Sequence, residues 1–164
     1  VDVVADAGAV AGGPIHAGDG ERLVLLPRLE HIREHVGGVL ELLAGRVLVA
    51  HHAAFERAFL SRELARAGYD LGLDEGACVC TMDQSRIYLP PGSHSLRGVA
   101  KRLGLPPAPR HRAMHDAETC ASLLRYYVEF EQRGQRYTDT ATNRDGAPVY
   151  PAQWERARCW APIS

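Results

Sequence analysis

Two histidines and a carboxylate follow a short apolar run in the first half of the chain. In VAHHAAFERAFL, residues 49–60, the apolar run ends at His51 and His52, and Glu56 follows four residues later. In open α/β sheets, the junction between a strand and the next helix lies at the edge where binding and catalytic sites are built. The spacing therefore predicts a metal-binding or acid–base carboxylate, although an ordinary strand-to-helix junction has the same pattern.

A second group of reactive side chains lies in HRAMHDAETCASLL, residues 111–124. His111 precedes a predicted helix, and Asp116 falls in the first turn of that helix. A carboxylate in this position is also favoured by the helix dipole alone. Each of the two groups is therefore a weak indication of function when it is considered separately.

The histidine spacings also fit a single-ion site. His52 and Glu56 are four residues apart, as are His111 and His115, so each pair could share one face of a helix. Together with Asp116 they would form a zinc or iron site of histidines and a carboxylate. The alternative is that these histidines are ordinary surface or hydrogen-bonded side chains.

Taken together and in order, the motifs resemble those of a known family. VAHHAAFERAFL resembles the second motif of the DEDDh 3′–5′ exonucleases, the family of the polymerase III proofreading subunit and RNase T. HRAMHDAETCASLL resembles their third motif, and CTMDQSRIYLPPGSHSLRGVAKRLGLP resembles the region between the two. PIHAGDGERLVLLPRLEHIREHVGGVLELLAGR is similar to the segment in which an IHG-like turn leads to a helix. The resemblance covers residues 14–130.

This resemblance implies an RNase H-like α/β fold and hydrolysis of phosphodiester bonds at the 3′ end of single-stranded DNA or RNA. In such enzymes carboxylates hold two Mg²⁺ or Mn²⁺ ions, and a histidine acts as general base. The corresponding positions here are Glu56 and Asp116 for the metal and His111 for the base. The resemblance places substrate contacts at His51, His52, Phe55, Ser95 and Arg112.

The chain departs from the family pattern at three places. Glu56 stands where the family has Asp, and His52 stands where it has Asn. The first acidic motif, D-x-E, is missing; its nearest counterpart has Asp6 in place but Gly8 at the Glu position. Residues 1–13 would then follow the first strands, and the opening hairpin is expected upstream of Val1. A catalytically degenerate domain that binds nucleic acid or a protein partner is the resulting alternative.

The remaining pattern predicts the elements that position these residues. Apolar residues at three- and four-residue steps predict helices over residues 27–44, 54–68, 95–105 and 115–134, the third capped by Ser93 or Ser95. Short apolar runs predict strands at residues 46–50 and 78–82, and VDVV at the start is a further short strand. The rest of residues 1–20 is expected to form a loop. The chain is thus predicted to be α/β, a central sheet flanked by helices, but with few strands.

Length and composition fit one globular domain. Of the 164 residues, 46% are hydrophobic and 24% charged. We expect an exonuclease-like domain over residues 1–134 and a C-terminal extension over 135–164 that covers the domain or docks onto a protein partner. No apolar run approaches the roughly 18 residues of a membrane span, so a cytoplasmic protein is expected.

Charge and cysteine content exclude other classes. The formal net charge is −1, which argues against strong unspecific binding to nucleic acid but allows a local basic surface. The cysteine spacings match no zinc motif, and the thiols are predicted to be reduced and mostly buried. The expected phosphate-binding surface consists of Arg97, Lys101, Arg102, Arg110 and Arg112, unless these side chains form only a solvated helix face.

Overall fold

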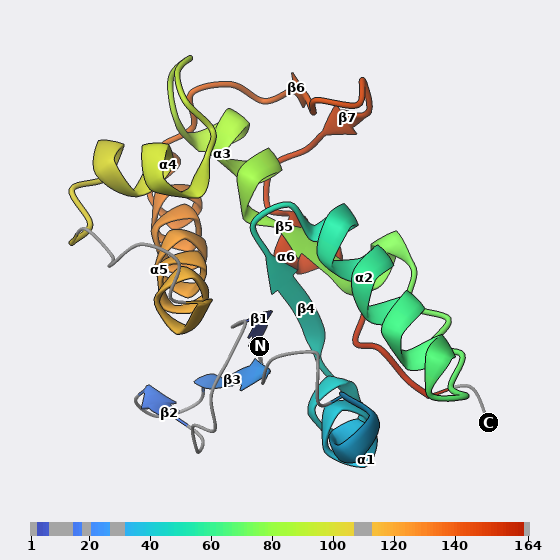
Figure 1. Cartoon of the computed structure of the whole chain (residues 1–164). Helices are drawn as coiled ribbons and strands as arrows, with labels where there is room; N and C mark the ends of the chain where they lie inside the picture. The colour runs from blue at the N-terminus through green and yellow to red at the C-terminus, as the bar shows by residue number, and fades with distance from the viewer. Residues whose placement is uncertain (1–2, 7–14, 18–20, 27–31, 107–112, 163–164) are drawn as a thin grey trace.

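Strands and helices alternate around a single large sheet (Figure 1). The structure, a computed structural model, describes residues 3–6, 15–17, 21–26, 32–106 and 113–162. Its helices are α1 (Ile32–Leu43), α2 (Ala53–Arg66), α3 (Thr81–Tyr88), α4 (Leu96–Arg102), α5 (Ala113–Gln132) and α6 (Gln153–Arg156), with a 3₁₀ turn, η2, at Glu75–Ala77. The α/β class expected from the sequence is confirmed.

The main sheet has five strands within the described residues, in the order β2-β3-β1-β4-β5. Strand β1 runs parallel to β3 and β4, β4 runs parallel to β5, and β2 is antiparallel to β3. The carboxyl ends of β1, β4 and β5 therefore meet at one edge. The strands are β1 (Val3–Asp6), β2 (Ile15–Ala17), β3 (Glu21–Leu26), β4 (Val47–Ala50) and β5 (Cys78–Cys80).

Two hydrophobic layers cover the sheet. Leu48 and Ala50 of β4 pack on the side of α1 and α2, whereas Val47 and Val49 pack on the side of α5. Figure 1 accordingly shows α2 on one side of β4 and α5 on the other. Successive strand residues point to opposite faces, so a strand covered on both faces must be apolar throughout. All four residues of β4 are buried, as its sequence predicted.

The sheet is broader than the sequence predicted. Residues 3–26 supply three strands, although only VDVV was expected to form one and the opening strands were expected upstream of Val1. The expected IHG-like turn is wrong, because Ile15–Ala17 instead forms strand β2, which pairs with β3. These strands were missed because β2 is only three residues long and the apolar residues of β3 show no strict alternation.

The predicted strand over residues 78–82 is too long. It ends at Cys80, and Thr81 begins α3, a helix that the sequence did not suggest. The buried face of α3 includes Thr81, Gln84 and Ser85, which are polar. Their spacing is helical, but a hydrophobic periodicity does not register polar residues. The other predicted helices are confirmed in type, and their described ends differ from the prediction by a few residues; residues 27–31, the predicted start of the first helix, lie outside the described residues.

The C-terminal extension packs against the body of the domain. The buried Trp160 donates its indole N–H to the carbonyl oxygen of Leu71 at 2.6 Å. The backbone of Trp160 also pairs with Gly45 and Arg46, between α1 and β4. The extension, which showed no periodicity in sequence, contains a small hairpin of β6 (Ala141–Thr142) and β7 (Pro148–Val149), followed by α6.

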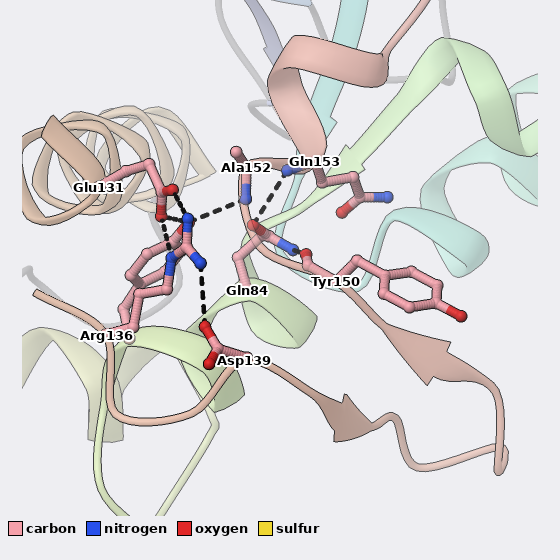
Figure 2. A network of polar contacts seen from close by, with 8 residues as sticks. Gln84, Glu131, Arg136, Asp139, Tyr150, Ala152 and Gln153 are labelled. Atoms are coloured by element: carbon pink, nitrogen blue, oxygen red, sulfur yellow. Dashed lines mark hydrogen bonds and ion pairs between the residues drawn. The ribbon is translucent and has the colours of Figure 1, made fainter. Parts of the chain in front are cut away.

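A polar network joins this extension to α3 and α5 (Figure 2). Arg136 binds Glu131 and Asp139, and Gln84 of α3 donates to the carbonyl of Tyr150 at 2.9 Å. The side-chain amide of Gln153 accepts from the Cys80 N–H and donates to the Cys78 carbonyl. It thereby occupies backbone groups at the outer edge of β5, which would otherwise be open to another strand.

Two expectations about composition can also be compared with the structure. Cys78, Cys80 and Cys120 are buried free thiols and Cys159 is an exposed one, as predicted for reduced cysteines. Within the described residues, no helix is both long enough and apolar enough to cross a membrane.

Replacing Trp160 should destabilise the whole domain. Trp160→Ala is expected to lower the free energy of unfolding by about 3–5 kcal/mol, because it leaves a cavity and removes the bond to Leu71. Urea denaturation would measure the change. Tyr137→Ala, which removes an exposed ring of the same extension, should change it by less than about 0.5 kcal/mol. Equal losses for the two variants would contradict the anchoring role of Trp160.

Candidate functional site

The candidate site is built at the carboxyl edge of the sheet. Val4 of β1 pairs with Leu48 of β4, so Asp6 and Ala50, two residues further on, end their strands side by side. Ala50 is also level with Cys80 at the end of β5. His51, His52 and Glu56 follow Ala50, while α5 lies against β1 and β4. The predicted motifs thus come together where open α/β sheets place their sites.

His51 is held by protein atoms at both ring nitrogens. Nε2 lies 2.9 Å from the carbonyl oxygen of His94, and Nδ1 lies 3.0 Å from the hydroxyl of Thr81. Because a carbonyl can only accept, Nε2 carries the proton and Thr81 donates to Nδ1. Burial lowers the pKa of His51 to about 4, against the opposing effect of the His94 carbonyl. His51 is therefore neutral at physiological pH.

These bonds continue into neighbouring elements. The Thr81 hydroxyl lies 3.3 Å from the sulfur of Cys120 on α5, and the His94 ring lies 2.7 Å from the hydroxyl of Ser85 on α3. One chain of polar contacts thus joins β4, α3, α5 and the loop before α4. Thr81, His94 and Cys120 were not predicted as site residues; the only signal in sequence was the Cys-Thr pair at a strand end.

His52 and Phe55 form an aromatic surface at the start of α2, in which His52 is half-buried and Phe55 is exposed. Their rings stack at 5.9 Å between centroids, and Phe55 stacks on Phe59 at 6.4 Å. Phe55 is 58% exposed, which is unusual for a large apolar side chain. His52 has a left-handed backbone, φ 88°, a conformation for which Asn, the family residue, is better suited. Of these three rings, Phe55 is exposed, whereas His52 and Phe59 are half-buried.

The two predicted metal-binding carboxylates lie in the first turns of two different helices, α2 and α5. Glu56 is in the first turn of α2, and Asp116 is an exposed residue in the first turn of α5. Burial raises the pKa of Cys120 to about 12, and the charge of Glu56 contributes to that rise. Cys120 is one helical turn after Asp116, on the same face of α5. Glu56 is thus within electrostatic reach of the helix that bears Asp116.

Other predicted residues have structural partners. Ser95 caps α4, accepting a hydrogen bond from the Gly98 N–H at 3.1 Å. His115 pairs with Glu118 at 3.1 Å, and Arg102 donates to the carbonyls of Ser93 and Pro90. Arg102 therefore holds the loop before α4. Contacts of Ser95 and His51 with substrate stay predictions.

Part of the predicted site lies outside the described residues. This applies to His111 and Arg112, to Arg110 of the basic surface, and to Gly8. Of the basic surface, Arg97 and Lys101 are described and exposed. The phosphate-binding role of this surface stays a prediction.

The described side chains do not form a complete metal site. Among them, no three or more His, Cys, Asp or Glu residues come together in a way that could hold an ion. The single-ion hypothesis used His52, Glu56, His111, His115 and Asp116; His111 lies outside the described residues, and the other four find no support among them. A two-ion site of the family type, with four carboxylates, is matched only in part by Glu56, Asp116 and the position of Asp6.

The pKa of His51 predicts a loss of stability in acid. As the pH falls, the unfolded chain takes up a proton near 6.5 while folded His51 resists protonation until about 4. The free energy of unfolding should therefore fall in this range, by up to about 3 kcal/mol from His51. Denaturation across this pH range should show a steeper fall for the wild type than for His51→Gln. The free energy of unfolding of the variant would still fall in part because of His94, since burial also lowers the pKa of this histidine. Identical slopes would contradict the assignment.

Comparison with known proteins identifies the family. The model of the exonuclease family matches residues 26–124, more than half of the chain. PolC-type DNA polymerase III of Thermotoga petrophila and that of Thermotoga maritima are each 31% identical over 110 residues, covering 66% of this chain and 8% of the relative. The Staphylococcus haemolyticus protein of the same name is 30% identical over 101 residues, covering 61% of this chain and 7% of its own length.

This chain thus spans less than a tenth of the length of these relatives. No solved structure matches it. The family match begins at Leu26 and includes both motifs that flank the carboxyl edge, from His51–Glu56 to Asp116. The chain is therefore a member of the exonuclease family of the DEDDh type.

Proposed function

We propose that this protein is a 3′–5′ exonuclease with an RNase H-like fold that removes nucleotides from single-stranded DNA or RNA. The observation that supports this most is the stack of the half-buried His52 ring and the exposed Phe55 ring, next to Glu56 in the first turn of α2. A flat aromatic surface binds any base by its π-face, which suits an enzyme without sequence preference. Metal ions held by the carboxylates beside this surface would activate the neighbouring phosphodiester for hydrolysis.

Each residue has a distinct part in this proposal. Phe55 and His52 stack on the terminal bases, and Glu56 and Asp116 are the described ligands for Mg²⁺ or Mn²⁺, ions that prefer oxygen. His111 takes the proton of the attacking water, as its family position suggests. Because this ligand set is incomplete, we expect slower hydrolysis than in an exonuclease with all four carboxylates. A cytoplasmic location and a protein partner for the C-terminal extension belong to the same proposal.

A second candidate function is binding without hydrolysis. It is favoured by Gly8, which stands where the first acidic motif has Glu, and by the incomplete set of ligands among the described side chains. The aromatic surface and the cations Arg97 and Lys101 would remain available to a strand. Retention of single strands in EDTA, weakened by salt, would support this function if no cleavage occurs.

Replacing Asp116 should abolish hydrolysis. With a 5′-labelled single-stranded oligonucleotide and Mn²⁺, we expect a ladder that shortens from the 3′ end. Asp116→Ala should slow it at least about 100-fold, because a ligand of the ion is lost. Glu129→Gln removes a carboxylate near the other end of the same helix and should leave the rate unchanged. No ladder with folded wild-type protein would contradict the exonuclease proposal and leave the binding function.

Replacing Phe55 should weaken substrate binding more than chemistry. Phe55→Ala is expected to raise KM about 5- to 150-fold, since stacking on one base contributes about 1–3 kcal/mol, with a smaller effect on kcat. Tyr69→Ala, which removes another exposed ring beyond the end of α2, is the matched control. An unchanged KM in Phe55→Ala would show that the aromatic surface does not contact the strand.

A further inference from the structure

Acidic residues are missing from one continuous part of the chain. No Asp or Glu occurs between Asp83 and Asp116, although the chain has 20 of them, and this stretch contains six Lys or Arg residues. The formal net charge of −1 is thus unevenly distributed along the sequence. The described part of the stretch, residues 84–106 and 113–115, comprises the second half of α3, the loop before α4, α4 itself and the first residues of α5.

The cations of this stretch have no carboxylate partners among the described residues. None of the ion pairs between described side chains involves any of its four described cations, Arg86, Arg97, Lys101 and Arg102. Several arginines of α2 and of the C-terminal extension are paired, by contrast. The four charges therefore add, and they create a positive potential around α4.

The ring of His94 lies within this potential. Burial lowers the pKa of His94, and the charges of Arg86 and Arg102 lower it further, against the opposing effect of Asp83. His94 belongs to the loop before α4, and its carbonyl oxygen accepts from Nε2 of His51 at 2.9 Å. The positive potential thus extends to the carboxyl edge of the sheet, where the candidate site lies.

The loop and α4 form a compact support for the exposed cations. Arg102 donates to the carbonyls of Ser93 and Pro90. A Cβ atom at Gly98 would lie 2.2 Å from Oγ and 2.6 Å from Cβ of Ser93, so the loop packs directly on the backbone of the helix. Figure 1 shows α4 beside α5, which it contacts. Because this support is folded without a ligand, binding costs little ordering of the chain.

Two cations of α4 point into solvent. Arg97 and Lys101 are exposed and four residues apart, so they share one face of the helix, about 6 Å apart along its axis. This spacing suits neighbouring phosphates of an extended single strand. Protein interfaces are enriched in aromatic side chains, whereas residues 84–106 contain no exposed large hydrophobic side chain. Charge without such side chains suits a phosphate backbone better than a protein partner.

We propose that the α4 surface, formed by Arg97, Lys101 and the loop before α4, binds the phosphate backbone of a single strand upstream of its 3′ end. The inference rests on the proposed function, which places the 3′ end at the carboxyl edge. The bond between His94 and His51 joins the two surfaces. The strand then passes from the aromatic surface at Phe55, across the edge of the sheet, to α4.

Binding of fluorescent oligothymidylate to the full chain in EDTA, followed by fluorescence anisotropy, tests this path. Arg97→Ala combined with Lys101→Ala should weaken binding of a strand of about 12 nucleotides about 10- to 30-fold at about 0.1 M KCl, because two phosphate contacts are lost. The slope of log K against log salt concentration should become less steep by about 1.4. Arg62→Ala combined with Arg144→Ala, which removes two exposed arginines of other segments, should change neither value.

A charge-preserving variant separates the loss of charge from a change in folding. Arg97→Lys combined with Lys101→Arg should bind the strand like the wild type. Equal losses in the two alanine double variants, or an unchanged salt slope, would overturn the proposal. Binding of polyglutamate as tightly as oligothymidylate would also overturn it and would assign the α4 surface to an acidic protein segment.

Strand length separates this inference from the proposed function. A dinucleotide is too short to reach from the candidate site along α4, so the double variant at Arg97 and Lys101 should raise KM for the long strand only. An equal rise in KM for the dinucleotide would overturn the inference. Cleavage of the long strand with an unchanged KM would overturn this inference alone. Binding through Arg97 and Lys101 without cleavage in Mn²⁺ would overturn only the exonuclease proposal.

Discussion

The arrangement of the candidate site depends on one buried, neutral imidazole. His51 lies where β4 ends, and its two nitrogens bind the His94 carbonyl and the Thr81 hydroxyl. A buried polar ring without such partners would cost several kcal/mol, so the loop before α4 and the start of α3 must remain close to β4. The following turn then sets the direction of α2, and with it the positions of Phe55 and Glu56. The site is thus organised by a histidine that is itself enclosed.

The C-terminal extension also covers the outer edge of β5. An open edge strand invites pairing with other chains, and here Gln153 occupies backbone groups of both Cys78 and Cys80. Trp160 then attaches the end of the described extension to Leu71 and to the segment between α1 and β4. The same segment also forms one wall of a cavity beside α2, so the covering of the edge and the formation of this cavity have one cause.

The part of the chain that matches the family is extensive, whereas the acidic residues expected from the family are incomplete. The match to the exonuclease family covers the chain from β4 into α5, including Phe55. By the resemblance to the family, the set of acidic residues is reduced, with Glu56 in place of Asp and Gly8 in place of Glu. In the proposed function, binding of a strand would rely on the aromatic surface, whereas hydrolysis would rely on the carboxylates. The two proposed functions differ in whether the carboxylates still act.

The sequence by itself determined the parts whose signal is local. Helical spacing predicted α2, α4 and α5; a continuous apolar run predicted β4; and the motifs around Glu56 and Asp116 indicated the family. Only the tertiary structure decided the parts that depend on contacts distant in sequence. The bond of His51 to His94 spans 43 residues, that of Gln153 to Cys80 spans 73, and α3 buries polar residues that periodicity overlooks. A sequence pattern indicates which residues can be buried, but the hydrogen-bond partners of the buried groups depend on tertiary packing.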